Sequence, residues 1–511
     1  MPHIKELIVV MGIAIAVFLA ARPLCLAFMR SEDFTLRRNV WFALTVCAFL
    51  SPSFWLYVLV AVALLGWAGR RDSNPAALYL VAFGVIPPVT IYIPVVGINT
   101  LFALSQARIL GLVLLLPLAL RLFSVNEGGL ARRWIALDWL LVAYLLLQLA
   151  IVSPYETVTA SMRRGFLLSI DTLLVYYVFS RALLSRRALV DTMAAFVMVG
   201  AVYASIGIFE SFKGWLMYEQ IGLDWGSPPK VFSFLGRGGF LRAQASAGHS
   251  LTLGYILCVA FGFWLYLRTH IGSPTARFLT TALFCVGIYT THSRGPWLTA
   301  IVVYLVYLFI APGGKPAFFK GIAALVLFLG GLALTPFGER AIATLPFIGT
   351  LDQDTVIYRQ TLAERSWQLI LQNPFLGDPF VLRNLADLRN GLDFVDLMNA
   401  YAAVALFYGF VGLGLFVVFF TLAMGRAYLR QRQLRAWAPD LSGIGASLVA
   451  CMFASLFFMA TASIDWVEYV LAGMLSSYVG LLALGREPEG LAARSPAAAR
   501  PSGFVLGESA R

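Results

Sequence analysis

The stretch "GLGLFVVFFTLAMGRAYLRQRQLRAW", residues 412–437, joins a long apolar run to four arginines, with no acidic residue among them. A helix that crosses a bilayer needs about 20 mostly apolar residues. Cytoplasmic loops of membrane proteins carry an excess of Lys and Arg. The stretch therefore predicts a membrane-spanning helix whose basic end, residues 425–437, lies on the cytoplasmic side.

The composition extends this pattern to the whole chain. Of its 511 residues 60% are hydrophobic and only 13% are charged, whereas soluble domains have about 25% charged residues. The apolar runs have the length of spanning helices and lack the alternating polarity of barrel strands. We predict an all-α polytopic membrane protein. The net charge of +12 fits basic cytoplasmic loops, so no nucleic-acid partner is expected.

The apolar runs predict about 14 transmembrane helices. Residues 40–68 allow two interpretations, either one helix kinked at Ser51-Pro52 or two short helices, and they leave the side of the N-terminus open. The remaining candidates are residues 7–28, which are expected to be a retained anchor, and 77–95, 108–122, 135–152, 165–183, 188–210, 250–267, 278–291, 296–311, 319–335, 400–425, 442–463 and 466–485.

Placing residues 425–437 in the cytoplasm puts the short basic loops from residue 69 onward on that side. Two long loops then face outward. Within the second, apolar residues at helical spacing predict a helix over 355–372, ended by Asn373-Pro374. The expected organisation is a bundle over 1–335 with a periplasmic loop at 211–249, a large periplasmic loop at 336–398, C-terminal helices at 399–485 and a disordered cytoplasmic tail at 486–511.

Metal and disulfide chemistry find little support in the sequence. The five cysteines lie inside apolar runs at spacings that indicate neither a disulfide framework nor a zinc site. The "DQD" at 352–354 has the form of an Asp-x-Asp metal motif, but such short acidic patterns are common. We expect no metal and no cofactor.

Membrane insertion favours Lys and Arg in cytoplasmic loops, so arginines on the outer side of the membrane are candidates for a functional role. Arg294 follows His292 at the end of a span, and Arg242 precedes His249 after a glycine-rich stretch. Arg294 alone fits snorkelling as well as anion binding, and either histidine alone fits a polar helix end. Together with Arg359, these residues predict a site for an anionic headgroup such as a lipid-linked diphosphate, because guanidinium groups match phosphate oxygens.

Acidic residues within or near the spans allow another interpretation. These residues are Asp138, Asp171, Glu210, Asp465 and Glu468. Asp171 and Glu210 could pair with basic residues and stabilise the bundle, or they could form a proton path, which keeps a transporter among the alternatives.

Four segments, in order, resemble the O-antigen ligase and O-antigen polymerase superfamily, over roughly residues 230–425. In chain order the segments are "LRAQASAGHSLTLG" (241–254), "THSRGPWLTAIVVYLV" (291–306), "YRQTLAERSWQLILQNPFLGD" (358–378) and "MNAYAAVALFYGFVG" (398–412). The first resembles the family's Arg…Gly-His-Pro-Asn motif, with Ser250 in place of proline, and the second resembles its Ser-Arg-Gly motif. The third resembles the start of the family's large periplasmic loop, and the fourth resembles its His-Asn…Gly-x-x-Gly pattern.

At one position this chain departs from the family pattern, and the residue found there distinguishes the family's ligases from its polymerases. The ligases carry a histidine where this chain has Met398, and methionine cannot accept a proton. The resemblance therefore implies a polymerase of surface or secreted polysaccharides, with a GT-C-like helical bundle in the bacterial inner membrane and an active site that faces the periplasm. A ligase that transfers glycan to a lipid acceptor, a lipid-linked oligosaccharide flippase or other transporter, and a non-catalytic scaffold are the alternatives.

The resemblance implies an undecaprenyl-diphosphate-linked oligosaccharide as substrate. Membrane lipid is a further expected partner, and so is a chain-length regulator or export complex. A sugar hydroxyl of the acceptor would attack the anomeric carbon of the donor, and arginines would stabilise the departing diphosphate without a metal. The candidate bases are His249, His292 and Asp396; the candidate substrate-binding residues are Arg242, Arg294, Arg359, Asn399 and Tyr401.

Overall fold

The protein folds into a bundle of helices. The structure is a computed structural model, which describes most of the chain. The described residues are 3–86, 88–95, 98–124, 134–226, 236–237, 239–333, 353–388, 395, 397, 399–463 and 466–483.

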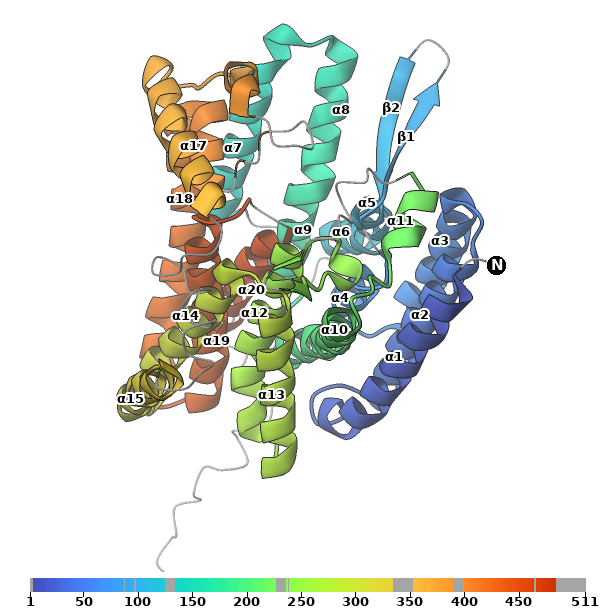
Figure 1. The fold of residues 1–511 in the computed structure, drawn as a ribbon, viewed down its shortest axis with the longest axis vertical. Coiled ribbons are helices and arrows are strands. Elements are labelled where there is room, and N and C mark those ends of the chain that lie inside the picture. The colour runs from blue at the N-terminus through green and yellow to red at the C-terminus, as the bar shows by residue number, and fades with distance from the viewer. Residues whose placement is uncertain are drawn as a thin grey trace, which may run out of the picture.

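Helices dominate the first half of the bundle (Figure 1). Two π-helical turns, η1 (Gly111–Leu115) and η3 (Ser169–Leu174), and the 3-10 turn η2 (Ser153–Tyr155) interrupt or join these helices. The helices are α1 (Ile4–Cys25), α2 (Ser31–Leu50), α3 (Phe54–Arg71), α4 (Pro75–Phe83), α5 (Gln106–Leu110), α6 (Leu116–Ser124), α7 (Ala136–Val152), α8 (Val158–Leu168), α9 (Val175–Arg181) and α10 (Arg186–Lys213).

The second half is also helical. Its 3-10 turns are η4 (Ala245–Ala247), η5 (Arg268–His270) and η6 (Val381–Leu388). Its helices are α11 (Glu219–Asp224), α12 (Ser250–Leu267), α13 (Pro274–Thr290), α14 (Arg294–Ile310), α15 (Gly314–Ala333), α17 (Gln353–Gln372), α18 (Ala400–Leu434), α19 (Pro439–Met459) and α20 (Trp466–Ala483). Residues 355–372 thus form the predicted helix.

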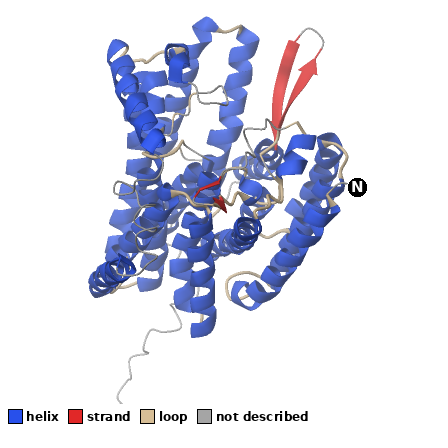
Figure 2. Cartoon of the chain, viewed as in Figure 1, coloured by secondary structure: helices blue, strands red, loops and turns tan. Residues whose placement is uncertain are grey.

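Strands occur in two antiparallel pairs of the described chain (Figure 2). A long hairpin joins β1 (Thr90–Val95) to β2 (Ile98–Ser105), and a short pair joins β3 (Gly236–Arg237) to β4 (Phe240–Leu241). The predicted span over 77–95 is therefore wrong: α4 is nine residues long, too short to cross a bilayer. The apolar run continues past α4 as β1, whose β-branched residues suit a strand.

Residues 40–68 form two helices, which settles the alternative left open by the sequence. α2 ends at Leu50, and α3 begins at Phe54 after Ser53, whose side chain accepts a hydrogen bond from the backbone N–H of Leu56. Pro52 lacks a backbone N–H and disfavours helical geometry in the residue before it.

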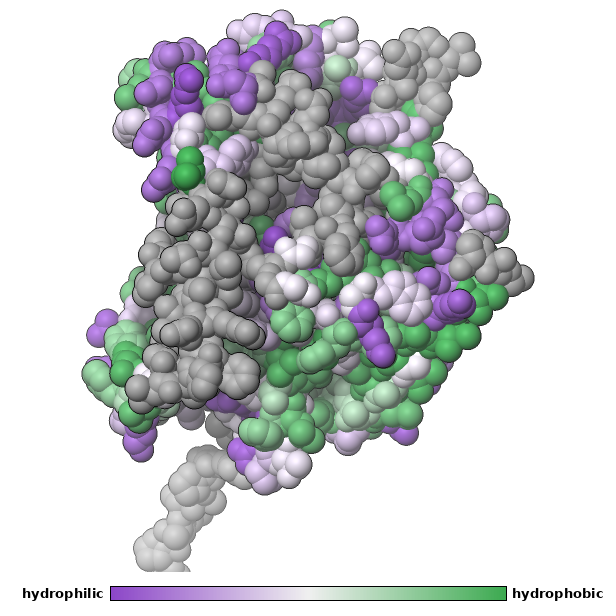
Figure 3. Space-filling view, in the orientation of Figure 1, coloured by the Kyte–Doolittle hydropathy of each residue, from purple (hydrophilic) through white to green (hydrophobic). Residues whose placement is uncertain are grey.

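Burial separates the bundle into a centre and a rim. α10, α12 and α19 are buried on nearly all sides, whereas α1 is apolar yet mostly exposed, with Ile8 and Leu19 on its outer face. Apolar surface in that position fits contact with lipid. Figure 3 shows apolar residues over α1 to α3 and hydrophilic residues gathered over α17 and the α7–α8 tip. Eight helices of the described chain are long and apolar enough to span a membrane, consistent with an all-α polytopic membrane protein.

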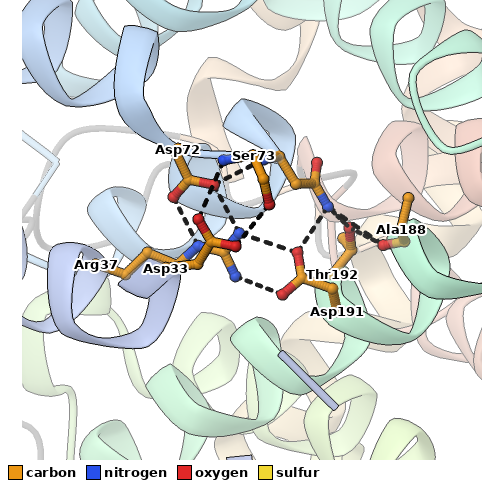
Figure 4. A network of polar contacts seen from close by, with 8 residues as sticks. Asp33, Arg37, Asp72, Ser73, Ala188, Asp191 and Thr192 are labelled. Carbon is orange, nitrogen blue, oxygen red and sulfur yellow. Dashed lines mark hydrogen bonds and ion pairs between the residues drawn. The ribbon is translucent and has the colours of Figure 1, made fainter. Parts of the chain in front are cut away.

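A buried polar network ties α2, the α3–α4 connection and α10 together (Figure 4). Arg37 is fully buried and donates two hydrogen bonds to each of two carboxylates, Asp72 and Asp191, at 2.7 to 2.9 Å. The Asn74 amide donates to Asp191 and to Thr192, each at 2.9 Å. Buried charges are tolerated when they are paired and hydrogen-bonded, as they are here.

Two of the acidic residues noted within the spans pair with arginines. Asp171 accepts hydrogen bonds from Arg108, and Asp138 lies 2.5 Å from a guanidinium nitrogen of Arg181. Both pairs join different helical segments, and for Asp171 a basic partner is one of the two alternatives that the sequence predicts. Asp465 lies outside the described residues.

Candidate functional site

The segment after β4 packs against the turn between α13 and α14. The backbone N–H of Ala243 donates to the carbonyl of Thr290 at 3.1 Å. The Arg242 Nη2 donates to the Ser293 Oγ at 2.7 Å, and that hydroxyl in turn lies 3.4 Å from the Ser250 Oγ. These contacts place the guanidinium of Arg242 at the beginning of α14.

Arg294 is the first residue of α14, so the two arginines meet at one helix N-terminus. Ser293 is the N-cap residue and Pro296 lies in the first turn, where a missing N–H costs little. α12 can approach this turn because Gly254 has no side chain: a Cβ there would lie 2.5 Å from Pro296 Cγ. The guanidinium of Arg242 and the positive end of α14, whose first residue is itself an arginine, together favour an anion at this position.

Glu210, near the end of α10, holds the segment that carries Arg242. Its fully buried carboxylate accepts hydrogen bonds from the backbone N–H groups of Met217, Gln244 and Ala245 at 2.7 to 3.0 Å. The sequence suggested a basic partner or a proton path for Glu210; the structure instead shows a carboxylate that pins the backbone two residues after Arg242.

His249 lies beside this arginine as the N-cap of α12. Its Nδ1 accepts the backbone N–H of Leu251 at 3.2 Å, which assigns the proton of the neutral ring to Nε2. Burial and the charge of Arg242 lower the pKa of His249 to about 4. The ring is therefore neutral near pH 7 and offers an N–H donor.

His292 lies in the α13–α14 turn with an unusual backbone. Its φ is +44°, a conformation rare for residues other than glycine. Its Nε2 lies 3.2 Å from the Ser211 Oγ, and its ring stacks on Phe240, with ring centroids 5.6 Å apart. Strained backbone of this kind concentrates at functional sites. His292 is brought to the same turn as Arg242 and Arg294.

The two candidate residues at the beginning of α18 serve its local structure. The Asn399 Oδ1 caps the helix by accepting the backbone N–H of Ala402 at 3.1 Å. The Tyr401 hydroxyl donates to the carbonyl of Leu456 at 2.7 Å. Asp396, the third candidate base, lies outside the described residues.

Arg359 is on α17, which packs on α18 and η6, so its element differs from those that position Arg242 and Arg294. The chain after α17 docks closely on α18. Gly409 has φ +63°, and a Cβ there would lie 2.2 Å from the carbonyl carbon of Phe375. Gly377 has φ +69°, and its Cβ would lie 2.6 Å from the carbonyl oxygen of Leu406. The two glycines permit this backbone contact, which anchors α17 over the bundle.

The sequence does not predict the roles of two residues that shape the site. Ser293 connects Arg242 to the first turn of α14, and its signal in the sequence is its place as the serine of the Ser-Arg-Gly segment. Glu210 positions the Arg242 segment through backbone N–H groups, which no side-chain pattern reveals. Within the described residues, no three His, Cys, Asp or Glu side chains gather as candidate metal ligands.

The comparisons with known proteins bear on the part of the chain that holds the α13–α14 turn. No curated protein matches the chain. A family model described as O-antigen ligase matches residues 279–417, which contain His292, Arg294, Arg359, Asn399 and Tyr401. Arg242 and His249 precede the matched range. Over residues 279–417 the chain thus has the sequence pattern of O-antigen ligases, and this match confirms its resemblance to the O-antigen ligase and polymerase superfamily.

Proposed function

We propose that the protein is a membrane glycosyltransferase that polymerises undecaprenyl-diphosphate-linked repeat units at the periplasmic face of the bacterial inner membrane. One observation carries the proposal: the hydrogen bond from Arg242 to Ser293 brings Arg242 to the N-terminus of α14, where Arg294 begins the helix. A lipid-linked diphosphate presents the anionic group that such a site favours.

The chemical step transfers a glycan from one oxygen to another. The acceptor hydroxyl oxygen bonds to the anomeric carbon of the donor, and the bond from that carbon to the diphosphate oxygen breaks. Undecaprenyl diphosphate leaves with the bonding pair, and the acceptor proton passes to a base. Negative charge grows on the leaving group, so positive groups aimed at it lower the barrier more than they stabilise the bound donor. We assign this role to Arg242 and Arg294.

The histidines differ in the roles their geometry supports. Because the Nδ1 of His249 already accepts a hydrogen bond, its Nε2–H suits donation to an anionic oxygen. His292 and Asp396 remain the candidate bases. We propose that Arg359, on α17, binds phosphate or sugar of the incoming substrate.

The second candidate function is an O-antigen ligase, which the description of the matched family model favours. Met398 favours the polymerase, because the family's ligases have a histidine there that takes part in transfer. The two differ in product: a polymerase lengthens the glycan on its lipid carrier, and a ligase moves a finished glycan to another lipid.

The test replaces each arginine by alanine in cells that express the variants at the wild-type level, followed by sizing of the surface glycans. Losing one such donor costs about a hundredfold or more in rate. We expect Arg242→Ala and Arg294→Ala to yield single repeat units in place of long chains. Long chains that accumulate on the undecaprenyl carrier would indicate the ligase instead.

Two controls sharpen this test. Arg277→Ala removes an exposed arginine at the opposite end of α13 and should leave chain length unchanged. Arg294→Lys keeps the charge but loses the planar fork, and we expect it to recover part of the activity. Full-length polymer from both alanine variants would overturn the proposal.

A further inference from the structure

A second candidate site lies apart from the arginines, between α4, α5, α7, η3, α18 and α20. It is a cavity of about 460 Å³, the size of a small-molecule site. Its walls contain many aromatic rings, donated by four different helices. The aromatic residues are Tyr79, Tyr144, Phe407, Tyr408, Trp466 and Tyr469.

Hydrogen-bonding groups in this cavity are left unused by the protein. Gln148 lines the cavity and is 8% exposed, and within the described part of the chain its amide makes no hydrogen bond. The same holds for the hydroxyls of Tyr144 and Tyr469, which are 5% and 8% exposed. These three side chains are thus available to pair with the hydrogen-bonding groups of a ligand in the cavity.

The charge of the cavity differs from that of the arginine site. Its carboxylate, Asp171, accepts hydrogen bonds from the Arg108 Nε and Nη2 at 2.7 to 3.1 Å, so its charge is neutralised. Among the described residues that line the cavity there is no lysine or arginine. A diphosphate therefore finds little compensation here, and an uncharged polar ligand fits better.

The backbone around Asp171 is also specialised. Ile170, Asp171 and Thr172 line the cavity from η3, a π-helical turn between α8 and α9. Another π-helical turn, η1, packs against η3. Single π-helical turns inside α-helices are frequent at functional sites, where they redirect side chains.

The α4 helix connects the cavity to the arginine site. The α4 helix contributes Tyr79 to the cavity, and the carbonyl of Gly84 at its end accepts a hydrogen bond from the Ser246 Oγ at 3.0 Å, within the segment that Glu210 holds. Trp466 packs on Phe83 of α4, with ring centroids 3.9 Å apart. The backbone that positions Arg242 is thus connected to the cavity wall.

We propose that this cavity binds uncharged sugar residues of the glycan, as a subsite separate from the diphosphate site. A sugar ring has C–H groups on its faces, which pack on aromatic rings, and hydroxyls on its edges, which can pair with Gln148, Tyr144 and Tyr469. The nature of the glycan rests on the proposed function, but sugar binding itself does not require catalysis.

The experiment measures binding to the purified full-length protein in detergent. The probe is an oligosaccharide of one repeat unit, released by mild acid from the surface polysaccharide of the cells that make the protein, and titrated by saturation-transfer NMR. We expect Gln148→Leu and Tyr469→Phe each to raise the Kd of the oligosaccharide about tenfold, because each substitution removes a hydrogen bond to the sugar. Melting temperatures would establish that both variants fold.

Two further variants separate this cavity from other sites. Tyr304→Phe removes a hydroxyl from α14, outside the cavity lining, and should bind as the wild type does. Arg294→Ala should also retain binding, because the released oligosaccharide has no diphosphate. Wild-type protein that fails to bind the oligosaccharide, or unchanged binding in Gln148→Leu and Tyr469→Phe, would overturn the subsite; the latter would favour a lipid chain in the cavity.

The proposed function can fail independently. Normal polymer in Arg242→Ala and Arg294→Ala cells, together with weakened sugar binding in Gln148→Leu, would reject the polymerase and keep the sugar subsite.

Discussion

His249 is a partly buried ring beside the guanidinium of Arg242, and its pKa is lowered from 6.5 to about 4. Between these two values the unfolded chain binds a proton that the folded protein does not. The free energy of unfolding therefore falls as the pH drops from about 6.5 toward 4. At pH 5 this amounts to about 1–2 kcal/mol. His249→Asn keeps a capping side chain but removes the ring that takes up the proton. The melting temperature of this variant should therefore fall less between pH 7 and pH 5 than that of the wild type.

His270→Asn is the matched control, because His270 follows the far end of α12 in η5 and bonds to Asp440. The His270→Asn variant should retain the pH dependence of the melting temperature that His249 causes. An identical pH dependence in the wild type and His249→Asn would show that His249 is not held neutral.

Among contacts between elements, the close backbone contact of residues 374–378 with α18 depends on Gly409. Gly409 has φ +63° and ψ −169°, a region that only glycine adopts readily. An alanine there would also place its Cβ against the carbonyl group of Phe375. We expect Gly409→Ala to lower the free energy of unfolding by at least about 2 kcal/mol. It should also speed proteolytic cleavage within 373–388, which limited proteolysis and melting temperatures would measure.

Gly414→Ala is the control within the same helix. No heavy atom lies within 4 Å of a Cβ at Gly414, so this variant should be neutral or slightly stabilised. Equal stability of Gly409→Ala and Gly414→Ala would contradict the role of the close backbone contact.

Sequence reasoning succeeded where one element carries its own signal. The helix predicted over 355–372 follows from local periodicity, and the turn between α13 and α14 follows from local polar residues. The prediction of one helix over 77–95 is wrong, because the β-branched residues of β1 alternate in a strand-like manner within the same apolar run. The contact of Arg242 with Ser293 joins residues 51 positions apart, and no local pattern encodes such a distance.

At the scale of the whole molecule, α10 connects the buried ion network to the candidate site. Asp191, near its beginning, binds Arg37, and Glu210, near its end, holds the backbone at Gln244 and Ala245. The helix is apolar and buried along most of its length. Its position therefore depends on polar contacts at both ends, together with close packing between them.

Arg37→Ala would leave Asp72 and Asp191 buried without their cation. Removing one partner of a buried ion pair costs about 3–5 kcal/mol, since the remaining charge has no compensation. We expect a large loss of folded protein and a lower melting temperature in detergent. Arg38→Ala is the matched control: Arg38 is the next residue, is half-buried and within the described chain bonds to the Asn39 side chain and to no carboxylate, so its loss should cost far less than the loss of Arg37. Adding Asp72→Asn and Asp191→Asn to Arg37→Ala removes the buried charges and should restore part of the stability. A lack of such rescue, with Arg37→Ala as stable as Arg38→Ala, would show that the network does not hold α10 in place.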